Sequence, residues 1–137
     1  MSRDTYKEQS VLTAIAPQAV ADDTPLVSAI IDRNGYQKAN FLLASGALAD
    51  AGATFTVLLE GGDAANLSDA AAVADADMRG TESAASFTQA DDNETRTLCY
   101  VGSKRYLRMT ITPSGNGAAA NFCVLAQLLE PLVVAPA

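Results

Sequence analysis

Short segments in which apolar and polar residues alternate recur along this chain, separated by turn-forming residues. Residues 54–60 show the pattern most clearly, because Phe55, Val57 and Leu59 share one face of an extended segment. Similar segments occur at 26–32, 38–44, 95–101, 104–112 and 118–129, and no heptad or convincing helical period accompanies them. Evenly spaced short strands of this kind predict an all-β fold, an antiparallel β-sandwich with a jelly-roll-like arrangement.

Two turn signals predict hairpins. Asn34-Gly35 separates 26–32 from 38–44, and both residues tolerate the positive φ that tight hairpin turns require. Gly102-Ser103 separates 95–101 from 104–112 and suits a turn that begins with glycine. In the second hairpin, one face is expected to carry Leu98, Tyr100, Leu107, Met109 and Ile111.

Three parts of the chain differ in pattern. Residues 1–24 are polar at first and then carry Val11, Ile15 and Val20 around a proline, which predicts an extended N-terminal arm that adheres to a neighbouring molecule. Residues 25–130 form the predicted sandwich, and 131–137 form a short C-terminal tail. The segment 118–129 is apolar on both faces and is therefore expected to be central or covered by another subunit.

Residues 61–94 interrupt the strand pattern. They are rich in alanine, aspartate, serine and glycine, and they hold eight acidic residues and one base, Arg79. Aspartate, asparagine and glycine are poor helix formers. We expect a long excursion with short strands near 71–74 and 86–88, with a helical turn near 68–73 as an alternative.

Composition excludes several classes of function. The chain has 16 acidic and 9 basic residues, a net charge of −7, so phosphate backbones and anionic membranes repel it and no nucleic-acid or membrane partner is expected. It contains no histidine, which removes Ser-His-Asp and Cys-His catalysis and histidine-ligated zinc. No apolar run reaches the length of a membrane helix, and the N-terminus lacks the apolar stretch of a secretory signal.

No motif for chemistry is present. The sequence lacks a G-x-S-x-G elbow, a G-x-G-x-x-G loop and a Walker sequence, so we expect no enzyme and no cofactor. Asp75 and Asp77 would face the same way on a strand, but no calcium-loop motif contains them and solvated loop acids are the better interpretation. Cys99 and Cys123 are interpreted as two buried thiols that bind no metal, with a disulfide across neighbouring strands as the alternative.

The basic residues cluster. Residues 95–108 contain Arg96, Lys104, Arg105 and Arg108 and no acid, whereas residues 61–94 are acidic. Two solvated faces would explain this, and so would complementarity between copies, in which the basic segment of one copy meets the acidic excursion of the next. The candidate interface residues are Val11, Ile15, Val20, Arg96, Lys104, Arg105, Tyr106 and Arg108.

Three segments resemble a family when they are taken in order. Residues 54–63 (TFTVLLEGGD), 73–78 (VADADM) and 102–108 (GSKRYLR) resemble the "FTV-L-E–D" strand, the "V-D-D" excursion and the "G-KRY-R" hairpin of small tailed-bacteriophage structural proteins. The resemblance covers most of 11–128, although this chain is richer in alanine and has a longer polar N-terminus. The group that the chain resembles is similar to head decoration, or cement, proteins.

The resemblance implies a set of expectations. It implies a β-sandwich made in the host cytoplasm and bound to the outer surface of the capsid in the virion, often as a homotrimer at local threefold positions. Its partner would be the major capsid protein, and its role would be to stabilise the joints between capsomers.

Two alternatives remain open. A carbohydrate-binding or adhesion sandwich would need exposed aromatic residues, for which only Tyr36, Tyr100 and Tyr106 are available. A phage tail or head–tail connector subunit is the other.

Overall fold

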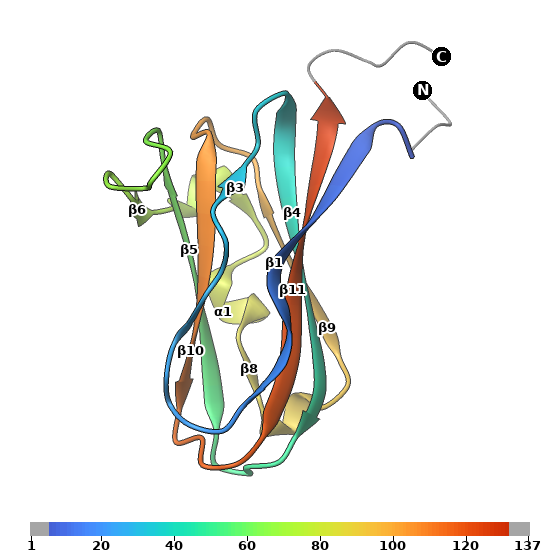
Figure 1. The fold of residues 1–137 in the computed structure, drawn as a ribbon, viewed down its shortest axis with the longest axis vertical. Helices are drawn as coiled ribbons and strands as arrows, with labels where there is room; N and C mark the ends of the chain where they lie inside the picture. The colour runs from blue at the N-terminus through green and yellow to red at the C-terminus, as the bar shows by residue number, and fades with distance from the viewer. Residues whose placement is uncertain (1–5, 132–137) are drawn as a thin grey trace.

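Strand β5 (Thr54–Gly62) shows how the alternating segments build the molecule. In a computed structural model, which describes residues 6–131, Phe55, Val57 and Leu59 are each at most 3% exposed. Thr54, Thr56 and Leu58, which alternate with them, face solvent. The predicted alternation of this strand is confirmed. Two antiparallel sheets pack face to face (Figure 1), and the buried side chains of β5 belong to the core between them.

The first sheet, sheet A, contains five strands. In spatial order they are β1 (Gln9–Val20), β11 (Ala120–Pro131), β4 (Tyr36–Leu48), β9 (Thr95–Tyr100) and β7 (Met78–Arg79). Strand β11 lies between β1 and β4, which confirms the central position predicted from its apolar faces.

Sheet B has two long strands, β10 (Tyr106–Ser114) and β5, which pair with each other. Short strands flank them. Strands β2 (Leu26–Val27) and β3 (Ile31–Asp32) pair with β10, and β6 (Ala71–Ala72) and β8 (Phe87–Thr88) pair with β5.

Connections between the sheets define the fold. Along the chain the strands pass back and forth between the sheets: β1 in sheet A, β2 and β3 in B, β4 in A, β5 and β6 in B, β7 in A, β8 in B, β9 in A, β10 in B and β11 in A (Figure 1). This alternation is the jelly-roll arrangement. The predicted all-β antiparallel sandwich of jelly-roll type is therefore confirmed.

Three phenylalanines pack at one end of the core. The rings of Phe55 and Phe87 stack with centroids 4.8 Å apart, and Phe122 of the opposite sheet meets both rings edge-on at 5.7 and 5.5 Å. These contacts join β5, β8 and β11. Aromatic pairs of this geometry stabilise a core beyond the area they bury.

Neither predicted hairpin forms. Strand β9 belongs to sheet A and β10 to sheet B, so the Gly102 turn carries the chain across the sandwich. A turn of the predicted type needs a positive φ at Gly102, which that residue does not have. Glycine is required there for another reason, because a Cβ would lie 2.5 Å from the hydroxyl oxygen of Tyr100.

The Asn34-Gly35 turn behaves in the same way. Only Gly35 has a positive φ, of 89°, and the turn closes with a hydrogen bond from Tyr36 N–H to Arg33 O. This geometry suits a single turn of type II. It leads from β3 in sheet B to β4 in sheet A instead of returning the chain along the same sheet.

Residues 9–20 do not form a separate arm. They form β1, which pairs with β11 and places Ile15 and Val20 in the core at 4% and 7% exposure. The structure thus differs from the predicted arm over 1–24, since the sandwich begins at Gln9. The alternation is hidden in the sequence because the register shifts between Thr13 and Ile15. Residues 1–5 of the predicted arm and 132–137 of the predicted tail lie outside the described residues.

The excursion of residues 61–94 contains only short elements. Strands β6 and β8 fall within the two short segments predicted to be extended. The predicted helical turn near 68–73 is absent there, and the one α-helix in residues 6–131 is α1 (Glu82–Ala85). Its N-cap is Thr81, whose hydroxyl oxygen accepts a hydrogen bond from Ala84 N–H at 3.0 Å. No helix in the described part of the chain is long and apolar enough to cross a membrane.

Candidate functional site

The outer face of sheet A is formed by alternate residues of its four long strands. Strand β11 directs Val124, Ala126 and Leu128 into the core, and the residues between them point outward. The outward residues Leu125, Gln127 and Leu129 are half-buried, although no other strand or helix of the described residues packs over this outer face. Their partial burial comes from neighbouring side chains on β1 and β4.

Two rows of side chains cross this face in register. One row is Thr13, Leu125, Leu42 and Thr97, and the next is Val11, Gln127, Asn40 and Cys99. We call these eight residues the neutral face, because none of them is charged. A surface of this size without charge stands out on a chain with a net charge of −7.

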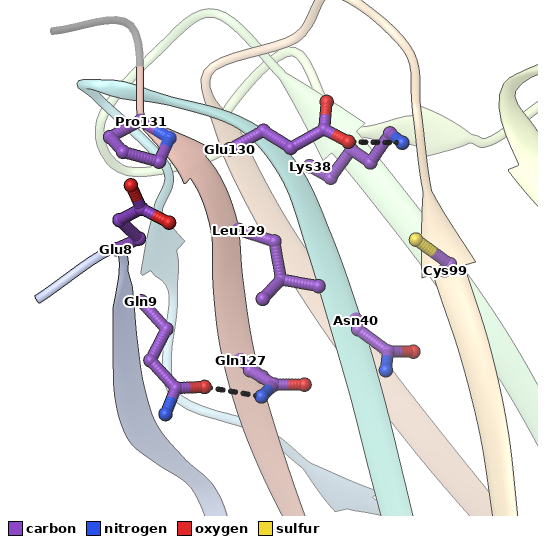
Figure 2. A pocket seen from close by; sticks show the side chains of 9 residues that line it. All are labelled: Glu8, Gln9, Lys38, Asn40, Cys99, Gln127, Leu129, Glu130 and Pro131. Carbon is purple, nitrogen blue, oxygen red and sulfur yellow. Dashed lines mark hydrogen bonds and ion pairs between the residues drawn. The ribbon is translucent and has the colours of Figure 1, made fainter. Parts of the chain in front are cut away.

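A hollow of about 750 Å³ opens at one end of the neutral face (Figure 2). Gln127 Nε2 donates a hydrogen bond to Gln9 Oε1 at 2.5 Å. The Asn40 carboxamide has no hydrogen-bond partner among residues 6–131. The hollow is lined by Glu8, Gln9, Lys38, Asn40, Cys99, Gln127, Leu129, Glu130 and Pro131.

One ion pair lies among the residues that line the hollow. Lys38 Nζ is 2.7 Å from Glu130 Oε1, and the hydrogen bond between them raises the pKa of Lys38. Burial raises the pKa of the Cys99 thiol, so it stays protonated at neutral pH and is a weak nucleophile. The hollow therefore offers the carboxamides of Gln9, Asn40 and Gln127 for hydrogen bonding, and the charged side chains of Glu8, Lys38 and Glu130 lie beside them.

The predicted interface residues fall in three different environments. Val11 lies on the neutral face with 53% exposure, so it is available to a partner. Ile15 and Val20 are buried in the core and cannot contact another molecule. Tyr106 is half-buried on β10, and the Arg105 guanidinium lies 4.9 Å from the centre of its ring.

The four predicted basic residues pair with acids of the same chain. Arg96 contacts Asp91 and Glu94 at 2.9 and 2.7 Å, and Lys104 contacts Asp63 at 2.8 Å. All three acids belong to residues 61–94. The predicted complementarity between the basic segment and the acidic excursion therefore exists, but it operates within one molecule.

The remaining two basic residues pair across sheet B. Arg105 makes two hydrogen bonds of 2.9 Å to the Asp32 carboxylate, and Arg108 contacts Glu60 at 3.1 Å. The first pair lowers the pKa of Asp32. These arginines already have partners and are poor candidates for a contact between copies.

Acidic residues in the loops serve as acceptors for backbone N–H groups. Asp50 accepts hydrogen bonds from Gly52 and Gly117, and Asp69 accepts from Asp63 and Ala64. These bonds lower the pKa of both carboxyls. The acid-rich composition therefore meets a structural need of the loops.

The remaining metal and cysteine predictions concern the excursion and sheet A. Asp75 and Asp77 lie in a single 3-10 turn, and residues 6–131 contain no group of three side chains placed to hold a metal ion. Cys99 and Cys123 are free and half-buried. Strand β4 separates them, so the alternative of a disulfide across neighbouring strands does not apply.

Sequence reasoning missed Asn40, Gln127 and Lys38. The available signal was the segment 118–129, which is apolar on both faces and so predicted a covered outer surface. The register between β11 and β4, which joins Gln127 to Asn40, could not be read from the sequence.

Comparison with known proteins places the fold. No protein-family model and no curated protein sequence matches the chain. Among solved structures, the PBSX exported protein XepA matches 93% of this chain with a TM-score of 0.58 and 16% identity. This chain spans 39% of that protein.

Two further structures are more distant. The CBM22-1 xylan-binding domain of Paenibacillus barcinonensis Xyn10C has a TM-score of 0.48 and 10% identity, covering 92% of this chain and 88% of that one. The SPBc2 prophage-derived protein YomS has a TM-score of 0.39 and 5% identity, covering 88% and 93%. Phage-derived proteins and carbohydrate-binding modules are thus both among the similar structures. At 16% identity the likeness to XepA is one of fold alone.

Proposed function

We propose that this protein is a structural component of a tailed-phage virion, a decoration protein that binds the outside of the capsid and performs no catalysis. The observation that carries the proposal is the neutral face of sheet A. A partner that covers this face removes few charges from water, so the cost of desolvation is small. The acidic residues on the remaining surface keep the bound protein soluble.

Other features support the same role. The segments that resemble decoration proteins occupy the sandwich itself, since residues 54–63 contain β5 and residues 102–108 lead into β10. Jelly-roll sandwiches recur in viral capsid proteins. The fold is also shared with XepA, an exported protein of PBSX.

The proposed partner is the major capsid protein, contacted across the joints between capsomers. A specific interface needs roughly 1,000 Å² or more of buried surface. The neutral face spans four strands and two rows of residues. The hollow at its end is a depression into which a loop of the partner can fit. The homotrimer implied by the resemblance stays a prediction.

A matched pair of variants tests the proposal. Thr97 and Thr112 are both exposed, on the outer faces of sheet A and sheet B respectively. Thr97→Glu adds a charge to the neutral face, and Thr112→Glu adds the same charge elsewhere. In co-sedimentation with expanded shells of the encoding phage, we expect Thr97→Glu to reduce binding at least tenfold and Thr112→Glu to bind like the wild type. Equal binding by both variants, or no binding by the wild type, would refute the proposal.

The free carboxamide of Asn40 favours one alternative, a carbohydrate-binding module. Unpaired amides are good hydrogen-bond partners for sugar hydroxyls. None of the described residues that line the hollow is aromatic, however, and Tyr100 is only 1% exposed. Binding of neutral oligosaccharides on a glycan array, lost in Asn40→Ala, would favour this alternative. Shell binding retained by the same variant would favour the decoration role.

A further inference from the structure

Strand β1 is unlike every other sheet edge in residues 6–131. The remaining edge strands, β2, β3, β6, β7 and β8, are two residues long, whereas β1 has twelve. Edge strands carry unpaired N–H and C=O groups, and proteins limit unwanted pairing by keeping such strands short or by adding charge, proline or bulges. Among the described residues the other terminal strands are therefore short, and the part of β9 that extends past β7, residues 95–98, carries the charged Arg96.

The second half of β1 is protected in these ways. The register shifts between Thr13 and Ile15 and again before Gln18, and Pro17 lacks an N–H. The carbonyl of Ala14 is also occupied, because it accepts a hydrogen bond of 2.9 Å from Ala29 N–H.

The first half of β1 has none of this protection. Gln9 to Thr13 pair with β11 in unbroken register, and within residues 6–131 no other strand pairs with β1. Val11 and Leu12 are 53% and 37% exposed. No residue of β1 is charged, so the charge that commonly protects such an edge is missing.

We infer that residues 9–13 of β1 pair with the same residues of a second copy, antiparallel and about a twofold axis at Val11. The pairing sets Gln9 opposite Thr13, Ser10 opposite Leu12, and Val11 opposite itself. Both sides are neutral, so no pair of like charges meets, and β-branched residues suit cross-strand contacts. The twofold arrangement uses both free edges, so assembly stops at a dimer.

The neutral edge makes a second copy the fitting occupant, because the pairing about Val11 sets no charged side chain of β1 against another. Each copy carries −7, so acidic surfaces repel one another and close approach is favoured where charge is absent. Pairing at β1 would also join the two A sheets and bring the two neutral faces side by side, because Val11 and Thr13 belong to both features. The inference does not depend on the decoration role, and the dimer is an alternative to the homotrimer that the resemblance implies.

Salt gives the first test. In a dimer of acidic molecules joined at a neutral edge, added salt screens the repulsion and tightens association. A dimer held by complementary charges would loosen instead. In sedimentation velocity of the full chain over a range of protein concentrations, we expect a monomer–dimer equilibrium that shifts toward dimer as ionic strength rises.

A matched pair of variants locates the interface. Val11→Lys adds the charge that protects natural edge strands, and Val27→Lys adds it on sheet B at a valine with similar exposure, 56%. We expect Val11→Lys to weaken the dimer at least tenfold and Val27→Lys to leave it unchanged. Equal weakening, a trimer, or a monomer at every concentration and salt would overturn the inference.

Hydrogen exchange of the wild-type protein provides a readout that needs no variant. The amides of residues 9–13 that face the free edge should gain protection as protein concentration rises, while those of residues 54–62 stay unchanged. Dimerisation with no added protection in residues 9–13 would overturn the inference, even if Val11→Lys failed to fold.

Discussion

Replacement of Ile15 by alanine tests whether residues 9–20 belong to the sandwich. Ile15 is 4% exposed and opposite Val124, a fully buried residue of β11. Removing a large buried aliphatic side chain costs about 2–5 kcal/mol, because both burial and packing are lost. Since β1 is an edge strand that can relax toward the gap, we expect the lower part of that range, about 2–3 kcal/mol.

The control is Val11→Ala, on the same strand but 53% exposed. We expect this change to cost less than about 1 kcal/mol, since surface substitutions rarely exceed 0.5 kcal/mol and only some strand propensity is lost. For a chain of this size each kcal/mol lowers Tm by roughly 3–5 °C. Ile15→Ala should therefore melt roughly 10 °C below the wild type, and Val11→Ala within a few degrees of it.

The assay is thermal and urea unfolding, followed by far-ultraviolet circular dichroism. A free arm would make the two variants equal to each other and to the wild type. That result, or deletion of residues 1–20 with no loss of Tm, would refute the assignment of β1 to the core.

Three further predictions concern turns, loops and sheet A. Gly102→Ala should lower stability by about 1–3 kcal/mol in urea unfolding, because the new Cβ would overlap the Tyr100 ring; an unchanged midpoint would contradict this. The pKa of Asp50 is lowered by the N–H groups of Gly117 and Gly52. The ionised carboxylate therefore stabilises the folded state fully above the unfolded pKa of about 3.9, and this stabilisation is lost as pH falls through the lower, folded pKa. Asp50→Asn should accordingly show a smaller fall in Tm below about pH 4 than the wild type. Finally, the raised pKa of Cys99 predicts slow alkylation by iodoacetamide at pH 7 in a Cys123→Ser background, with a rate that rises with pH; reaction as fast as that of free cysteine would refute it.

The strand pattern predicted most of the core. Phe55, Val57 and Leu59 are buried as their alternation indicates, and so are the five residues expected to share a face around Gly102. They lie together because β9 and β10 face each other from opposite sheets. A period of two reports which face is buried, and it holds whether the partner lies beside the strand or across the core.

Turn residues misled the topology for a related reason. Asn34-Gly35 and Gly102-Ser103 permit hairpins but do not require them. Of the residues in these two turns only Gly35 adopts a positive φ, and Gly102 instead makes room for the Tyr100 ring. Space for Tyr100 is a property of the packed core, which no local sequence pattern records.

The candidate site depended still more on packing. The outward positions of single strands are visible in the sequence, but the neutral face exists only because β1, β11, β4 and β9 lie side by side in one register. The charge clusters likewise showed in the sequence, whereas folding paired Lys104 with Asp63 in the same molecule.

Sequence alone therefore determined the class of fold, the buried side of most strands and the absence of histidine chemistry, since these follow from local alternation and composition. Tertiary structure decided which strands are neighbours, that β1 is an edge of the sandwich, and which charges neutralise each other. The physical reason is that each strand could form hydrogen bonds with many other strands of the chain, and each charged residue could form ion pairs with many others. Only the packing of one common core selects among them.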